Sequence, residues 1–391
     1  MLYTHVLKPF LFRFDPESVH NFFTRVGVWS GSNIITRAII GMMYNYRGRD
    51  ISTVVDGIRY RTPFLLSAGF DYNGELTRIL PCIGLGGEEI GSVTARPCEG
   101  NPKPRLTRLP KSESILVNKG LRNEGVDAII KRLKSVASRR VDTDEDALRA
   151  RLARARGIFQ QKNIRASESV SDRSDAVDFI LGISIARTND EASVPIQAGI
   201  DDYLYSFKRL NEENIGDYYT INISCPNSFG GEAFTSPELL TRLLDALKKV
   251  PCSKPVYVKM PINIPWEQFQ AILKVIDVHG LQGVVIGNLN KDYGSLTVRS
   301  EAPDMYKGGL SGKPCTHPST DLIYKTRELY GTRFTIIGVG GVMSPETMKE
   351  KIDAGADLVQ VISGLIFEGP GLVKRLGKAY ARLPISRKNA K

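Results

Sequence analysis

Eight short apolar runs recur along the chain, and the segments between them are mostly helical in pattern. Most of the runs are continuous stretches of Ile, Val and Leu, as expected for parallel strands buried on both faces. Eight alternations of strand and helix indicate an α/β fold of the closed (β/α)8 TIM-barrel type rather than an open doubly wound sheet. The predicted strands are 64–70, 87–94, 179–186, 219–225, 256–260, 283–288, 334–340 and 358–363. Helices are predicted over 236–249, 266–278, 320–330 and 345–354.

The length of 391 residues suits a barrel of about 250 residues with additions. Residues 1–46 are predicted to form a separate small helical segment, and residues 47–391 the barrel. A polar and charged stretch at 134–178 is predicted to be an insertion, partly helical and partly disordered, without a chemical role.

The N-terminal segment has three apolar patches, around Phe10, Phe22 and Ile39, with basic residues between them. Short helices with apolar faces and basic edges suit a membrane surface. The alternative is a helical hairpin packed on the barrel, because most amphipathic helices bury their apolar faces in protein. No stretch reaches 18 apolar residues, so a spanning helix is not expected, and the charges near the start do not fit a secretory signal.

The chain has 53 basic and 42 acidic residues, a net charge of +11. Such a surplus of positive charge suggests that the protein binds nucleic acid, an anionic membrane face or an anionic substrate. The alternative is that the charge only keeps the surface soluble. Zinc-ligand spacing and RNP-type aromatic motifs are absent, so neither a metal site nor a nucleic-acid partner is predicted. The five cysteines are irregularly spaced without a CxxC pair, which predicts a reducing compartment such as the cytoplasm.

Glycines follow the last two predicted strands, where (β/α)8 barrels have their phosphate sites. The seventh run ends at Gly340 and Gly341, and the eighth at Ser363 and Gly364. Glycine lets the backbone come close to a phosphate, whose charge the backbone amides bind. These two turns predict a cradle for the phosphate of a flavin or of a substrate.

Other strand ends carry Lys259, Asn222, Asn288 and Cys225. A buried lysine suits the negative charge of a reduced flavin, although a structural ion pair would also explain it. Asparagines can hold a flat polar ring, unless they are turn or cap residues. Cys225, which directly precedes a proline in a loop, is a candidate catalytic thiol, with a buried filler as the alternative.

Several motifs in order resemble the dihydroorotate dehydrogenase family. They include SAGFDYNGE at 67–75, NISCPN at 222–227, GGLSGKP at 308–314 and IIGVGG at 336–341. Such motifs span nearly the whole chain apart from 134–178. The stretch FRFDPESVH at 12–20 is similar to the membrane-binding helices of the quinone-type class, which favours the membrane interpretation over the packed hairpin.

The resemblance implies FMN-dependent oxidation of dihydroorotate to orotate in pyrimidine (UMP) biosynthesis, with electrons passed to a lipid quinone by a peripheral membrane protein. Cys225 falls at the position of the catalytic base, and Lys259 is expected to stabilise reduced flavin. The FMN contacts implied are Ala68, Gly69, Ser92, Asn222, Lys259, Gly312, Gly341, Ser363 and Gly364. The substrate contacts implied are Asn118, Gly120, Leu121, Asn222, Asn227 and Asn288, and the quinone tunnel would be lined by His20 and Arg108.

The chain departs from the family pattern at three positions. The quinone-type class has serine as the base where this chain, like the soluble class, has Cys225, whose ordinary pKa of about 8.5 suits proton abstraction. Tyr72 replaces the lysine of a GxDKxGE motif, which removes a cation expected near flavin and substrate, and Leu289 replaces a threonine. These changes leave two alternatives open. The enzyme could act on another dihydropyrimidine-like substrate or use a soluble electron acceptor such as fumarate. The chain could also be a catalytically silent, membrane-associated FMN-binding protein.

Overall fold

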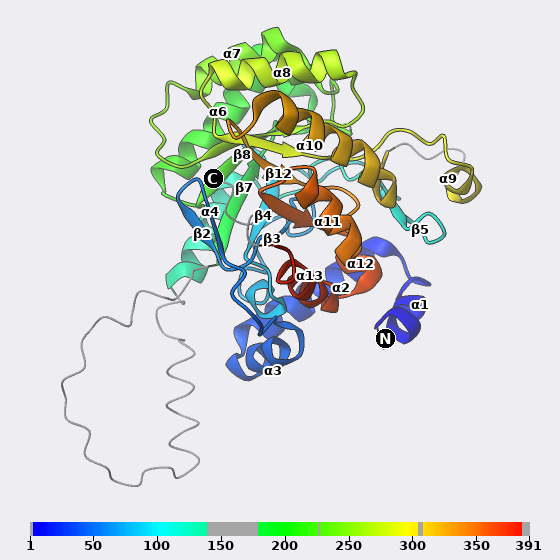
Figure 1. Cartoon of the computed structure of the whole chain (residues 1–391). Coiled ribbons are helices and arrows are strands. Elements are labelled where there is room, and N and C mark those ends of the chain that lie inside the picture. Colours follow the sequence, from blue (N-terminus) through cyan, green and yellow to red (C-terminus); the bar gives the residue numbers. More distant parts are fainter. Residues whose placement is uncertain (1–2, 139–178, 226, 304–307, 385–391) are drawn as a thin grey trace, which may run out of the picture.

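The computed structural model describes residues 3–138, 179–225, 227–303 and 308–384. All eight predicted strands are present and form one closed parallel barrel (Figure 1), which confirms the predicted fold class. Nearly all of the predicted insertion at 134–178 lies outside the described residues. In barrel order the strands are β3 (Phe64–Leu66), β4 (Gly87–Val93), β7 (Ile180–Ile185), β8 (Tyr218–Asn222), β9 (Val256–Met260), β10 (Gly283–Ile286), β12 (Thr335–Gly338) and β13 (Leu358–Val361).

Helices surround the barrel and bury one apolar face each against the strands (Figure 1). In α7 (Pro237–Leu247), for example, the buried positions are Leu240, Leu243, Leu244 and Leu247, which have the spacing of one helical face. The four predicted helices are confirmed, although α10 begins four residues earlier than expected. The other helices here are α4 (Val126–Ser138), α6 (Ile196–Glu212), α8 (Trp266–Val278), α10 (Thr316–Tyr330), α11 (Pro345–Asp353), α12 (Ser363–Glu368) and α13 (Gly371–Tyr380).

Two small antiparallel sheets lie outside the barrel wall, and neither was expected from the sequence. The hairpin of β1 (Thr53–Val55) and β2 (Ile58–Tyr60) packs Tyr60 against residues near the amino ends of the barrel strands, such as Leu65 and Tyr218. The second sheet joins β5 (Leu106–Leu109), β6 (Ser114–Val117) and β11 (Gly309–Gly312). Residues of this second sheet line the cavity described below, which places it over the carboxyl ends of the strands.

The N-terminal segment consists of a π-helical turn (Tyr3–Leu7), α1 (Lys8–Leu11), α2 (Pro16–Ser32) and α3 (Ile34–Tyr44). Asp15 caps α2 by accepting a hydrogen bond from the Ser18 amide at 2.7 Å, and Asn33 caps α3 in the same way. Figure 1 shows these helices together on one side of the barrel, near α12 and α13. None of the helices described is both long enough and apolar enough to cross a bilayer.

Candidate active site

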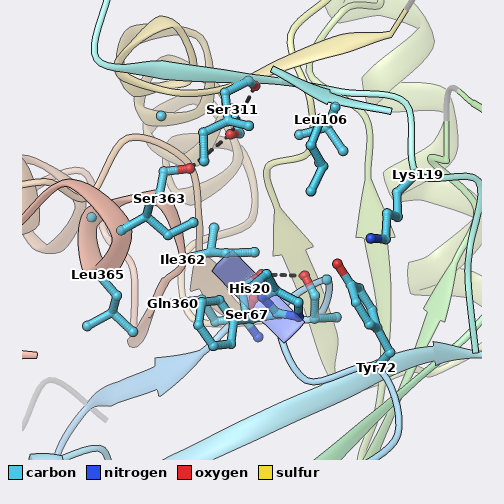
Figure 2. A pocket seen from close by; sticks show the side chains of 18 of the residues that line it. His20, Ser67, Tyr72, Leu106, Lys119, Ser311, Gln360, Ile362, Ser363 and Leu365 are labelled. Atoms are coloured by element: carbon cyan, nitrogen blue, oxygen red, sulfur yellow. Dashed lines mark hydrogen bonds between the residues drawn. The ribbon is translucent and has the colours of Figure 1, made fainter. Parts of the chain in front are cut away.

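One cavity of about 600 Å³ extends from the carboxyl ends of the barrel strands to the N-terminal helices. Its wall takes residues from the ends of most barrel strands, from β5, β6 and β11, and from α2 and α3. Figure 2 shows part of this wall, with Ser311 and Ser363 joined by a hydrogen bond, away from Tyr72 and Lys119. Every residue that the sequence predicted for the site, apart from Asn118, lines this cavity, and the roles of these residues stay predictions.

Cys225 lies three residues beyond the end of β8, in the wall of the cavity. Burial raises the pKa of its thiol to about 11, although a hydrogen bond from the backbone of Asn227 acts in the opposite direction. The sequence analysis expected the ordinary pKa of an exposed thiol, and the pKa of Cys225 is well above that value. The thiol is therefore almost entirely protonated at neutral pH.

Asn222 and Asn288 are held by a shared partner, Ser224. The Ser224 hydroxyl donates to Asn222 Oδ1 at 3.1 Å, and Asn288 Nδ2 donates to Ser224 Oγ at 2.7 Å. On the other side, Asn222 Nδ2 donates to Ser92 Oγ at 2.8 Å, and that oxygen lies 2.7 Å from Ser184 Oγ. The two amides are thus fixed in orientation. Ser224 was not among the predicted site residues, although it lies inside the NISCPN motif.

Lys259 is the residue of β9 that pairs with Asn222 of β8. Its side chain is buried, and this burial lowers the pKa of the ammonium, whereas the charges of Glu89 and Cys225 raise it. Glu89 lies within the barrel, where its Oε2 atom accepts from Thr220 at 2.9 Å and from Gln360 at 3.0 Å. Glu89 was not predicted from the sequence, although two consecutive glutamates inside an apolar strand are unusual enough to mark them.

The turns after β12 and β13 form a wall of bare backbone. Gly340 and Gly341 have φ angles of +102° and +71°, which a side chain would strain. A Cβ atom on Gly341 would come within 1.9 Å of Thr316 Oγ1, and one on Gly364 within 2.2 Å of Val342 O. Only glycine is compatible with these turns, because a side chain would collide with Thr316 or Val342, and both glycines line the cavity.

Toward the N-terminal helices the cavity is mostly apolar and contains His20 and Arg108. His20 lies edge-on to Phe70, with ring centroids 5.1 Å apart. Burial lowers the pKa of His20 to about 4, and the cationic Lys119 lies close enough to help lower it, so the imidazole is neutral. Arg108 donates to the carbonyl oxygen of Phe14 at 2.8 Å and stacks over Phe12 at 4.7 Å. The apolar wall around them includes Leu11, Val19, Phe23, Val26 and Ile79.

Asn118 is the one predicted site residue that does not line the cavity. Its Oδ1 atom accepts from Asn101 Nδ2 at 2.9 Å, and the same nitrogen donates to the carbonyl of Asn227 at 3.0 Å. Asn118 is therefore coupled to the loop of Cys225 through Asn101. Its predicted contact with the substrate stays a prediction.

The barrel, the cavity at the carboxyl ends of its strands and the helices over that cavity define a (β/α)8-barrel enzyme. Residues 50–382 match the family model described as dihydroorotate dehydrogenase. The chain belongs to the dihydroorotate dehydrogenase family.

Similar proteins match along nearly their whole length. The dihydroorotate dehydrogenase (quinone) of Delftia acidovorans is 31% identical, over 96% of this chain and 97% of its own. The protein of the same name from Synechococcus sp. (strain JA-3-3Ab) is also 31% identical, over 98% of this chain and 94% of its own. The ligand-free DHODH of Eimeria tenella, at 24% identity, has the same fold, with a TM-score of 0.74 over 96% of both chains.

Proposed function

We propose that this protein oxidises dihydroorotate to orotate with bound FMN and passes the electrons to a lipid quinone at a membrane surface. The observation that carries this proposal is the single cavity that joins the thiol and asparagines at the strand ends to the apolar N-terminal helices. Such a cavity lets two reactants of different polarity reach one redox group from different sides. The quinone in the names of the relatives agrees with the apolar end.

The residues present fit FMN. Gly341 and Gly364 leave bare backbone for the phosphate, beside the Ser363 hydroxyl, which donates to Ser311 Oγ at 2.9 Å. Gln360 lines the cavity, and its buried Oε1 atom has no hydrogen-bond partner among the described residues, so it is available to a donor on a polar ring. When bound, FMN would supply the hydride acceptor and the redox chemistry.

The side chains of the protein supply the proton transfer and the orientation. Cys225, as thiolate, takes the proton from the ring carbon beside the carbonyl group of dihydroorotate. Asn222 and Asn288, whose amides are fixed through Ser224, orient the flat pyrimidine ring. The ammonium of Lys259 lies in the same wall, where it stabilises negative charge at low dielectric.

The acceptor is tested by comparing oxidants on protein that has been reduced with dihydroorotate. A short-chain ubiquinone should reoxidise the reduced protein much faster than fumarate does, because a dianion would lose its hydration among apolar side chains. Orotate should accumulate in proportion to the quinol formed. Faster reoxidation by fumarate would contradict the quinone assignment and leave dihydroorotate oxidation intact.

Membrane binding is the part of this proposal that rests on exposed apolar side chains. Large apolar groups on α1, α2 and α3 face solvent, among them Phe10, Phe22, Trp29, Ile35 and Met42. Basic residues lie between them in sequence, which suits an anionic headgroup layer. We propose that these faces enter one leaflet, so that the apolar end of the cavity opens toward the bilayer.

The double substitution Trp29→Glu and Met42→Glu should weaken binding to anionic vesicles by at least about tenfold. Each exposed apolar side chain contributes on the order of 1.5–3 kcal/mol when it is buried, and glutamate is also repelled by the headgroups. Neither residue lines the cavity, so flavin reduction by dihydroorotate should be unchanged. Vesicle cosedimentation measures the effect. Val278→Glu on α8, at an equally exposed apolar position, is the matched control.

Point substitutions are a cleaner test here than truncation. Deleting residues 1–46 would also remove Glu17, which forms buried ion pairs with Arg105 and Lys119 of the barrel. Unpaired buried cations are costly, so a truncated protein would also change around Arg105 and Lys119. Vesicle binding of the double variant equal to that of the wild type would contradict the proposed membrane face.

A further inference from the structure

Lys119, in the loop after β6, contributes a buried ammonium group to the cavity. Its side chain is only 8% exposed, and its Nζ atom lies 2.8 Å from Glu17 Oε1. The ring centroid of Tyr72 is 5.2 Å from the same nitrogen, within the range of a cation–π contact. Figure 2 shows the side chains of Lys119 and Tyr72 approaching one another. No role was predicted for Lys119 from the sequence.

The positive charge around Lys119 exceeds the negative charge. Glu17 is shared by Lys119, by Arg105 at 2.7 Å and by Arg122 at 3.4 Å. Arg122 is 41% exposed, so water can solvate it, but Arg105 and Lys119 are both buried against this one carboxylate. The Arg105 guanidinium occupies both oxygens of Glu17. A buried excess of positive charge is stabilised by an anion.

The Lys119 ammonium also has donor capacity to spare. An ammonium has three N–H donors, and Nζ of Lys119 makes no regular hydrogen bond to a described residue beside its ion pair with Glu17. Burial lowers the pKa of Lys119 to about 8, but the charge of Glu17 raises it, so the ammonium form still predominates at neutral pH. The group is thus a buried, charged donor with N–H groups to spare, on a residue that lines the cavity.

The loop that carries Lys119 is fixed to the catalytic side of the cavity. The carbonyl of Gly120 accepts from Asn189 Nδ2 at 3.1 Å and from Cys98 Sγ at 3.3 Å. Asn227, two residues beyond Cys225, donates through Nδ2 to the carbonyl of Val117 at 2.9 Å. These bonds hold the loop against the segment that bears the proposed base, so the Lys119 backbone has a defined position relative to it.

We propose that Lys119 binds the carboxylate of dihydroorotate and of orotate, and thereby supplies the cation that is lost at Tyr72. This inference rests on the proposed function, whose substrate and product both carry a carboxylate. The other buried lysine of the cavity, Lys259, lies on β9 next to Asn222 and near the charge of Glu89. Lys119 is therefore the better placed cation for a ligand anion, and Tyr72 supports its ammonium group through the face of its ring.

The test compares ligands with and without a carboxylate on the FMN-loaded protein. Lys119→Met should weaken orotate binding at least about tenfold, as expected when a charge-assisted contact is lost, and should leave uracil binding nearly unchanged. Methionine has a similar length, and Glu17 keeps both of its bonds to Arg105. Calorimetry gives both affinities. Lys134→Met is the matched control, because Lys134 also pairs with one glutamate but lies outside the cavity.

Restoring the family arrangement gives a second test. In the double variant Tyr72→Lys, Lys119→Met, a lysine again stands in the GxDKxGE position, and orotate affinity should recover relative to Lys119→Met alone. If Lys119→Met loses FMN or unfolds early, Lys119→Gln and the double variant decide instead.

Orotate affinity within threefold of wild type in an FMN-loaded Lys119→Met protein would overturn the inference. So would a loss confined to the KM for quinone, which would assign Lys119 to the acceptor instead. Wild-type protein that binds FMN but neither binds orotate nor reacts with dihydroorotate would refute the proposed function itself, and this outcome is distinct from either of the other two.

Discussion

Cys225→Ala is expected to slow flavin reduction by dihydroorotate by about 10²- to 10⁴-fold, the usual contribution of a positioned general base. The alanine variant has no group that can take the proton, whereas Asn222 and Asn288 still orient the ring through Ser224. FMN content should be unchanged, because the glycine turns after β12 and β13 do not depend on the thiol. Stopped-flow absorbance at the flavin band, without oxygen or quinone, gives the rate directly.

The pH dependence separates a base from a packing residue. The pKa of Cys225 is raised to about 11, and only the thiolate accepts a proton. Below that pKa the thiolate fraction rises tenfold per pH unit, so the wild-type rate should rise with pH and level off only near pH 11. Cys225→Ser should keep partial activity with its profile displaced to still higher pH, because an alcohol is a weaker acid. A Cys225→Ala rate within threefold of wild type would rule out the catalytic role.

Gly341→Val is expected to yield colourless protein, with FMN affinity reduced more than about a hundredfold. The backbone at Gly341 has φ of +71°, and a Cβ atom there would lie 1.9 Å from Thr316 Oγ1 and 2.7 Å from Thr316 Cα. The turn after β12 must therefore move, and the backbone that would face the phosphate moves with it. The ratio of flavin to protein absorbance, followed by reconstitution with added FMN, measures the loss.

Gly57→Val is the matched control for this substitution. Gly57 has a similar φ of +78°, but a Cβ atom there has no atom within 4 Å, and the residue lies between β1 and β2, away from the cavity. It should show the cost of backbone strain alone and keep its FMN. Gly341→Ala should give a smaller loss of the same kind if Gly341→Val does not fold. Full FMN occupancy in both Gly341 variants would show that the phosphate is bound elsewhere.

The barrel could be predicted because its strands are buried on both faces, and this burial is visible in the sequence as apolar runs such as Gly283–Ile286. The sheet of β5, β6 and β11 could not. Its strand β11 has the sequence GLSG, whose glycines indicate a turn, and β5 carries Arg108 in its middle. All three strands are short, and β11 pairs with β6 across about 190 residues of chain, which no local sequence pattern predicts.

The candidate site could be predicted to the extent that barrel topology brings strand ends together. Asn222, Lys259 and Asn288 come from the ends of three different strands, and they line one cavity as that topology predicts. The ion pairs between Glu17 and Lys119 were missed because they join a helix near the N-terminus to a loop about 100 residues later. The one indirect signal in the sequence was Tyr72, which stands where the family motif has a lysine.

Anaerobic mixing of the purified yellow protein with dihydroorotate is the decisive test of the proposed reaction. The flavin absorbance band should bleach within one turnover. One orotate should form for each FMN reduced. Addition of a short-chain ubiquinone should then restore the band. Protein that holds FMN in full yet stays yellow with excess dihydroorotate, over the pH range in which Cys225 ionises, would contradict dihydroorotate oxidation by this protein.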